Sequence, residues 1–69
     1  MGDPRLASRL KEVRMARGLT QADLADMAGV SRKTVNTVEN GVFIPSTILA
    51  LDLARALETS VEDLFWLKD

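Results

Sequence analysis

Residues 20–41 read TQADLADMAGVSRKTVNTVENG, and this stretch carries the start and stop signals of two short helices. Thr20 is a typical N-cap residue, and Asp23 three positions later completes the pattern of a capping box. Gly29 ends the first helix, because glycine adopts a left-handed backbone conformation without steric cost. Ser31 is a second N-cap. The stretch therefore predicts two consecutive helices joined by a tight turn.

The residue types at the predicted crossing of these helices favour close contact. Ala25 lies in the first helix, and Val35 and Val38 form the apolar side of the second. A small side chain at such a crossing lets two helices approach closely at a steep angle. This is the helix-turn-helix arrangement, in which the second helix is suited to a DNA major groove.

Similar signals on both sides of this stretch predict three further helices. Asp3 and Pro4 are typical of a helix start, and Leu6, Leu10 and Val13 then form one apolar stripe. No segment shows the sustained alternation of an internal strand. The sequence thus predicts a single all-α domain over residues 1–69, with five short helices. Their expected bounds are residues 3–17, 21–28, 31–40, 47–57 and a short segment after Ser60.

Composition excludes several classes of protein. The 69 residues make one domain at most, and they include neither Cys nor His. A disulfide framework, a Cys/His zinc site and a nucleophile–His dyad are therefore excluded. No apolar run approaches the length of about 18 residues that suggests a membrane span, and no signal peptide is evident. We expect no enzymatic activity, no cofactor, no metal and no small-molecule ligand.

The net charge of −1 does not itself indicate a nucleic-acid partner. The charges are, however, unevenly distributed. Residues 1–41 hold seven basic and five acidic side chains, whereas residues 42–69 hold two basic and five acidic ones. The two parts carry +2 and −3, so the predicted helix pair lies in the more basic part of the chain.

The sequence resembles a known family over about residues 6–65. The motifs that match are Gly18-Leu19-Thr20-Gln21-Ala22-Asp23-Leu24-Ala25, Gly29-Val30-Ser31, Thr34-Val35, Val38-Glu39-Asn40-Gly41 and Pro45-Ser46. They resemble the Cro/CI-type (XRE-like) DNA-binding domain of phage repressors and many prokaryotic regulators. The short chain and its residues 61–66 resemble small stand-alone regulators of the cytolysin-regulator type. The resemblance implies a lambda-repressor-like fold.

Residues on the outer side of the second helix of the motif are candidates for reading bases. Arg and Lys donate to guanine, and Asn pairs with adenine. By pattern alone this side could equally be a solvated helix face, and the resemblance favours DNA contact. The candidates are Arg32, Lys33, Asn36 and Thr37.

A second set is expected to contact phosphate, because helix N-termini attract anions and the resemblance places Gln21 against the DNA backbone. Thr20 and Asn40 could also be plain caps. The set comprises Thr20, Gln21, Ser31, Thr34 and Asn40. The resemblance further implies a buried structural ion pair between Arg14 and Glu39, and Arg14 could also lie near phosphate.

A domain this small usually needs a disulfide, a metal ion or oligomerisation to stabilise its fold, and only oligomerisation remains for this sequence. Five apolar residues lack an obvious site within one protomer, namely Ile48, Leu51, Phe65, Trp66 and Leu67. We expect them to form a homodimer interface, with residues 64–69 dimerising and residues 65–67 extended along the partner. The expected function is a cytoplasmic, nucleoid-associated regulator of bacterial, archaeal or phage origin, and specifically a repressor at a pseudo-palindromic operator. The alternative is a protein-interaction module of the same fold, such as an antitoxin-like or co-activator-like adaptor.

Overall fold

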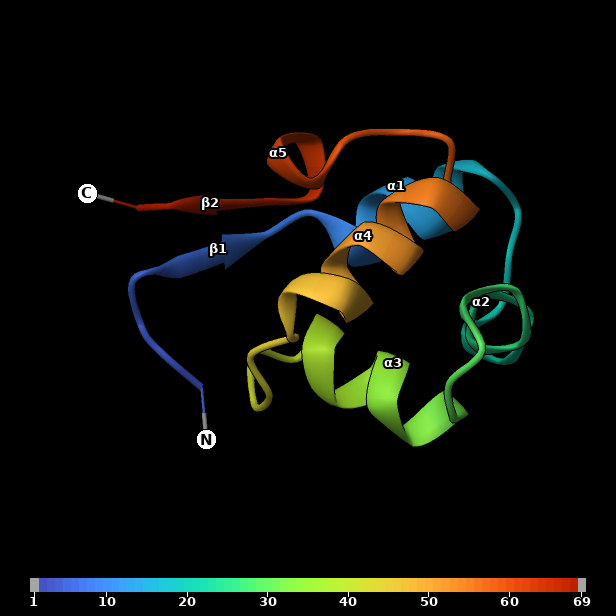
Figure 1. The fold of residues 1–69 in the computed structure, drawn as a ribbon, viewed down its shortest axis with the longest axis horizontal. Coiled ribbons are helices and arrows are strands. Elements are labelled where there is room, and N and C mark those ends of the chain that lie inside the picture. Colours follow the sequence, from blue (N-terminus) through green and yellow to red (C-terminus); the bar gives the residue numbers. More distant parts are fainter. Residues whose placement is uncertain (1, 69) are drawn as a thin grey trace.

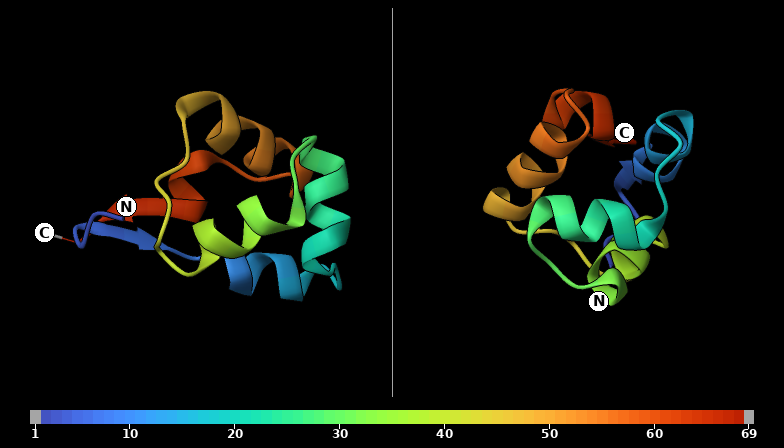
Figure 2. Two further views of the ribbon diagram at one scale, coloured as in Figure 1. Left: turned by 90° about the horizontal axis from the view of Figure 1, so that it is seen from below. Right: turned by 90° about the vertical axis from the view of Figure 1, so that its right-hand side faces the viewer.

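Five helices form the body of the protein, and two short strands project from one end of it (Figures 1 and 2). The computed structural model describes residues 2–68. In chain order the elements are β1 (Leu6–Ser8), α1 (Leu10–Ala16), α2 (Gln21–Ala28), α3 (Arg32–Glu39), α4 (Thr47–Ala56), α5 (Val61–Leu64) and β2 (Phe65–Leu67). The predicted all-α domain of five helices is confirmed in its helices, and the last four of them lie close to their expected bounds.

One apolar core joins all five helices. Its largest fully buried side chains are Leu10, Leu24, Val35, Leu53, Leu57 and Leu64. α4 supplies a large share of this core and packs against both α2 and α5. Burying such side chains is the main favourable term in folding. The contact of α4 with α2 therefore stabilises the position of the α2–α3 pair.

Local caps explain why four of the helices begin where the sequence predicts. The Thr20 hydroxyl accepts a hydrogen bond from the Asp23 amide at 3.0 Å, and the Asp23 carboxylate accepts one from the Thr20 amide at 3.0 Å. Hydrogen bonds to the Asp23 carboxylate from the Thr20 amide and side chain hold the pKa of Asp23 below its usual value. Ser31, Ser46 and Ser60 each accept a bond from the amide three residues later. Each cap satisfies an amide that the helix itself leaves free.

The expected helix start at Asp3 and Pro4 is wrong. Asp3 instead closes a turn, since its carboxylate accepts from the Arg5 amide at 2.9 Å and its carbonyl accepts from the Leu6 amide at 3.0 Å. The chain leaves this turn as β1, and α1 begins only at Leu10, where the Ser8 hydroxyl accepts from the helix amide.

The expectation of no strand is also wrong, because β1 pairs with the distant β2. The two strands are antiparallel, with Leu6 opposite Leu67, Ala7 opposite Trp66 and Ser8 opposite Phe65. Backbone bonds from Arg9 to Leu64 and from Lys68 to Arg5, both 2.8 Å, extend the pairing. The partner of β1 therefore lies at the other end of the sequence, where no local pattern reveals it.

Phe65 has a site within the protomer, contrary to the sequence prediction. It is only 9% exposed and belongs to the core, because the turn from α5 into β2 directs its ring inward. Residues 65–67 do run extended, but they pair with β1 of the same chain and not along a partner. Of the expected dimerising segment 64–69, Asp69 lies outside the described residues.

Candidate nucleic-acid interface

The α2–α3 pair forms the helix-turn-helix that the sequence predicts. Gly29 joins the helices with φ of 74°, a conformation that non-glycine residues rarely adopt. Ala25 is 2% exposed at the contact, next to the buried Val35 and Val38. Figure 1 shows α2 almost end-on while α3 lies across the view, so the two helices cross steeply. This packing leaves the opposite side of α3 open to solvent.

The candidate base-reading residues divide into two pairs. Arg32 and Lys33 are exposed in the first turn of α3, and neither forms an ion pair within residues 2–68. Asn36 and Thr37 are half-buried, although the sequence predicts that both point outward. The Thr37 hydroxyl donates to the Thr34 carbonyl at 3.0 Å, within the helix. Free donors are therefore concentrated at Arg32 and Lys33.

Arg14 and Glu39 lie together beneath this surface. Arg14 Nε is 2.6 Å from Glu39 Oε2, and Nη2 is 3.2 Å from Oε1. The Glu39 side chain is 1% exposed and that of Arg14 is 10% exposed. Arg14 Nη1 also donates to the Leu19 carbonyl at 2.8 Å. The hydrogen bonds with Glu39 raise the pKa of Arg14, so Arg14 stays charged. The bonds between the two side chains tie α1 to α3.

Gln21 connects this ion pair to the surface. Its Nε2 donates to Glu39 Oε1 at 3.1 Å, and its Oε1 accepts from Asn36 Nδ2 at 3.4 Å. Asn40 Nδ2 in turn donates to Asn36 Oδ1 at 3.2 Å. Two of the expected phosphate contacts, Gln21 and Asn40, thus belong to one hydrogen-bonded row with Asn36.

The other expected phosphate contacts lie at the two helix starts. Thr20 is exposed, and Ser31 caps α3 while its hydroxyl lies 3.0 Å from that of the half-buried Thr34. Next to α3, the loop residues Val42, Phe43 and Ile44 are exposed and carry no charge. Around α3, basic side chains therefore come from its first turn and not from the loop that follows it.

This geometry agrees with the comparison of the sequence with family models. The helix-turn-helix model HTH_3, which is the XRE or Cro/CI type, matches residues 10–64. The chain belongs to this family. Its members are non-enzymatic, DNA-binding transcriptional regulators. The match contains all of α1 to α5 and leaves out β1 and β2.

Similar proteins occur in bacteria and archaea. The chain is 38% identical over 64 residues to the HTH-type transcriptional regulator YgzD of Bacillus subtilis, covering 93% of this chain and 97% of that protein. It is 44% identical over 61 residues to an HTH-type transcriptional regulator of Methanothermobacter thermautotrophicus, covering 87% and 88%.

Solved structures give the same picture. The restriction-modification controller protein C.AhdI of Aeromonas hydrophila matches with a TM-score of 0.77 and 40% identity, over 80% of this chain and 83% of that chain. The clp gene regulator ClgR of Corynebacterium glutamicum matches with a TM-score of 0.75 and 31% identity, over 78% and 57%. The family fold therefore spans the helix-turn-helix and the helices that support it.

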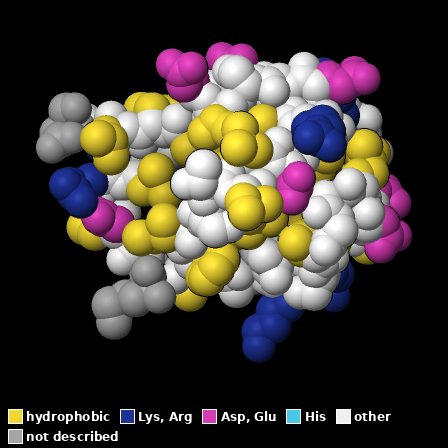
Figure 3. Space-filling view, viewed as in Figure 1, with side chains coloured by type: hydrophobic (Ala, Val, Ile, Leu, Met, Phe, Trp, Pro, Cys, Tyr) yellow, Lys and Arg dark blue, Asp and Glu magenta, His cyan; other side chains and the backbone are white. Residues whose placement is uncertain are grey.

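A second surface is apolar. Figure 3 shows hydrophobic side chains gathered over α4, α5 and the strands, with Lys and Arg at the lower edge beside α3. Ile48 is 73% exposed, Leu51 56%, Leu67 61% and Trp66 41%. Within residues 2–68, no helix has the length and apolarity needed to cross a membrane.

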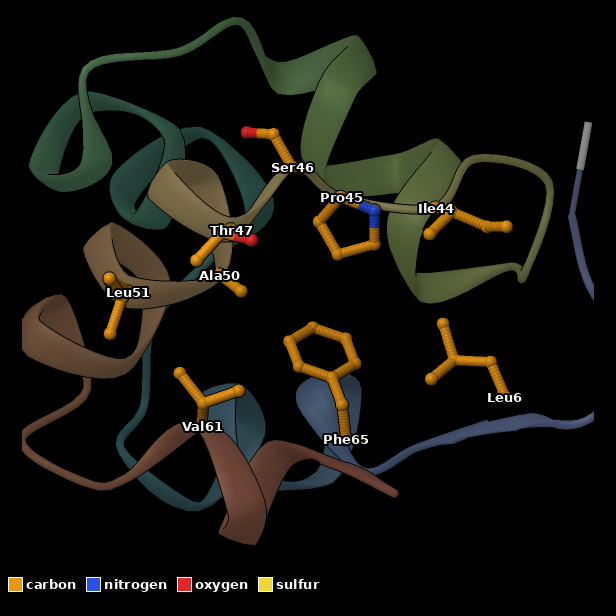
Figure 4. A pocket seen from close by; sticks show the side chains of 9 residues that line it. All are labelled: Leu6, Ile44, Pro45, Ser46, Thr47, Ala50, Leu51, Val61 and Phe65. Carbon is orange, nitrogen blue, oxygen red and sulfur yellow. The ribbon is translucent and has the colours of Figure 1, made fainter. Parts of the chain in front are cut away.

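A groove of about 370 Å³ lies in this apolar surface (Figure 4). Leu6 of β1, Phe65 of β2 and Val61 of α5 line one side, and Ile44 and Leu51 line the other. Phe65 thus forms part of the groove although it is not an exposed residue.

The sequence did not predict three features of these surfaces. The bonds of Gln21 to Glu39 and Asn36 depend on side-chain positions across two helices. The guanidinium of Arg9 lies 4.9 Å from the Trp66 ring centre, a cation–π contact made possible by the strand pairing. The groove needs Leu6 in a strand. The predicted contact between α2 and α3 is the only sequence signal for the bonds of Gln21, and the sequence holds no signal for the other two features.

Proposed function

We propose that the chain is a sequence-specific transcriptional repressor that places α3 in the major groove of double-stranded DNA. The observation that carries this proposal is the open side of α3, whose first turn holds Arg32 and Lys33, two cations that form no ion pair within residues 2–68. The second helix of a helix-turn-helix contacts base edges with its N-terminal residues. The chain belongs to a DNA-binding family, which supports this placement of α3.

Within this proposal the side chains have two roles. Arg32, Lys33, Asn36 and Thr37 read bases, because they lie on or beside the open side of α3. A second set holds phosphate and fixes the register of the protein on the duplex. It consists of Thr20, Gln21, Ser31, Thr34 and Asn40.

We further propose that the apolar surface forms a homodimer interface. The same surface carries exposed apolar side chains and an apolar groove. In a two-fold interface, side chains of each copy can therefore pack into the groove of the other copy. Ile48, Leu51, Trp66 and Leu67 supply the exposed side chains, and Phe65 contributes through the groove. Two copies of α3 would then read half-sites of a pseudo-palindromic operator about 34 Å apart.

Selection of bound sequences from random duplex DNA tests the function directly. We expect the selected duplex to bind about 10³-fold or more tightly than random duplex at moderate salt. The logarithm of the affinity should also fall steeply with the logarithm of the salt concentration, because bound phosphates release counterions. Equal binding of both duplexes would refute the repressor proposal. A flat salt dependence would favour the adaptor alternative.

Single substitutions separate the roles. Arg32→Ala, Lys33→Ala and Asn36→Ala should each relax the base preference at one operator position, by about 1–3 kcal/mol where the contact is bidentate. Thr20→Ser, a conservative change at the phosphate side, is the control and should leave every base preference unchanged. An unaltered base profile in all three α3 variants would show that another surface reads the operator.

Three wider assignments accompany this proposal. We place the protein in the cytoplasm, associated with the nucleoid, as its proposed target requires. We treat residues 1–69 as one DNA-binding domain. The cytolysin-regulator type is its proposed subtype, and this assignment rests on the resemblance of residues 61–66.

A further inference from the structure

A row of hydrogen-bonded side chains runs from the core to the outer side of α3. It begins at the Arg14–Glu39 pair and continues through Gln21 and Asn36 to Asn40. Exposure increases along the row, since the Glu39 side chain is 1% exposed, Gln21 and Asn36 are half-buried and Asn40 is exposed. A buried charge is thus connected to a candidate base-reading residue by one amide side chain.

The buried end of the row fixes the direction of every bond in it. A guanidinium only donates and a carboxylate only accepts, so Glu39, paired with Arg14, requires a donor from Gln21. The Gln21 amide must therefore turn its NH₂ group toward Glu39 and its carbonyl toward Asn36. Asn36 in turn presents its NH₂ group to Gln21 and its carbonyl to the NH₂ group of Asn40.

These bonds leave Asn36 with the groups needed for adenine. An Asn amide has two N–H groups and two acceptor sites, and the row uses one of each. Adenine offers an acceptor at N7 and a donor at N6 in the major groove. A rotated Asn36 amide, with its nitrogen and oxygen exchanged, would lose the bonds to both Gln21 and Asn40. The row therefore favours one orientation of Asn36.

We propose that Gln21 is a positioning residue that transmits the donor–acceptor direction set by Glu39 to Asn36 and thereby restricts Asn36 to adenine. This inference rests on the proposed role of Asn36 in reading a base. It gives Gln21 a second role beside its proposed phosphate contact. Loss of a phosphate contact alone would weaken all DNA sequences by the same factor.

The test uses the full chain and the duplex selected by the wild-type protein, with all four base pairs placed at each position in turn. Asn36→Ala first identifies the position that Asn36 reads. Gln21→Met, which keeps the length of the side chain but forms neither bond, should then reduce the preference for adenine at that position about fivefold or more. Lys11→Met, at an exposed residue of α1, is the control and should leave that preference unchanged.

A readout without DNA accompanies the binding data. The side-chain NH₂ signals of Asn36 in nitrogen-edited NMR spectra should shift and exchange faster with water in Gln21→Met, because the amide loses its partner. Gln21→Ala serves as the second variant if the methionine side chain disturbs the fold.

Three outcomes would overturn the inference, and they are distinguishable. A Gln21→Met protein that binds all sequences more weakly by one factor, with its adenine preference intact, overturns the inference alone. An Asn36→Ala protein with an unchanged base profile overturns the role of Asn36 as well. A wild-type chain that selects no sequence overturns the proposed function and the inference together.

Discussion

Glu39 is the side chain at which α1, α2 and α3 are tied together, and it accepts bonds from both Arg14 and Gln21. We expect Glu39→Ala to lower the free energy of unfolding by about 3–5 kcal/mol, because it leaves the buried guanidinium of Arg14 without its partner. Urea unfolding followed by circular dichroism measures this change.

An exposed ion pair provides the control for this prediction. Arg17 and Glu58 are 2.9 Å apart at the surface, with side chains 42% and 77% exposed. Because water screens such pairs, Arg17→Ala should cost about 1 kcal/mol or less. Equal losses in Glu39→Ala and Arg17→Ala would contradict a stabilising role of the buried pair.

Three aspartates have lowered pKa values in the folded protein, and these determine how the free energy of unfolding depends on pH. Hydrogen bonds from the Arg5 side chain and amide lower the pKa of Asp3 to about 2. Bonds from the Thr20 amide and side chain lower that of Asp23, and bonds from Thr59 and Ser60 lower that of Asp63. A carboxyl group with a lowered pKa in the folded state stabilises it fully above its unfolded pKa of about 4, and this contribution is lost as the pH falls through the folded value.

We therefore expect the urea midpoint to decrease steadily as the pH is lowered from about 5 to about 2. With no His in the chain, side-chain titration predicts a nearly constant midpoint between about pH 5.5 and pH 7. Asp23→Asn should give a shallower decrease than the wild type over the acid range. The same decrease in both proteins would mean that Asp23 does not contribute to it.

The helices could be predicted from the sequence because their N-caps are signals between residues close together in the chain. The caps at Thr20, Ser31 and Ser46 act within three residues of themselves, so the starts of α2, α3 and α4 are readable from the chain. β1 is held by β2, and a local pattern contains no information about a partner so distant in sequence. Leu6 continues the helical stripe of Leu10 and Val13, but one apolar residue fits a short strand before α1 as well as it fits a first helical turn.

The same distinction applies to the candidate site. The exposed Arg32 and Lys33 follow from helical periodicity and the family resemblance. The bonds that join Gln21 to Asn36 depend on rotamers on two crossing helices, and periodicity does not specify rotamers.

The first residue of β2 belongs to the core, and this predicts the effect of substitutions in that strand. Phe65 is buried in the core, so Phe65→Ala should lower the free energy of unfolding by about 3–5 kcal/mol. Leu67→Ala, at a residue 61% exposed, is the control and should change it little in dilute solution. Thermal and urea unfolding measure both. Similar values for the two variants would show that β2 does not complete the core.

For the whole molecule, the prediction concerns the proposed dimer. Because deletion of residues 65–69 would remove part of the core, substitutions on the exposed surface are the cleaner test. Ile48→Lys and Leu51→Lys should give folded monomers with much weaker operator affinity, since charges cannot be buried in an apolar interface. For the wild type, the melting temperature should rise with protein concentration.

Sedimentation velocity at several concentrations measures the state of association. Lys11→Ala changes an exposed charge on α1, a helix that supplies no residue to the groove, and should remain dimeric. A wild-type chain that stays monomeric at every concentration, and binds its selected duplex as tightly as Ile48→Lys does, would contradict the proposed dimer.

The contact between Arg9 and Trp66 provides a fluorescence signal for the step of folding in which the two ends of the chain meet. Trp66 is the sole tryptophan, and its ring and its strand partner Ala7 belong to opposite ends of the sequence. Its fluorescence therefore reports loop closure over nearly the whole chain, while the circular dichroism signal reports local helix formation. Since distant contacts form more slowly than local ones, stopped-flow refolding should show the fluorescence change lagging if the helices assemble before the ends meet. Identical rates for both signals would instead indicate that the ends join in the same cooperative step as the helices.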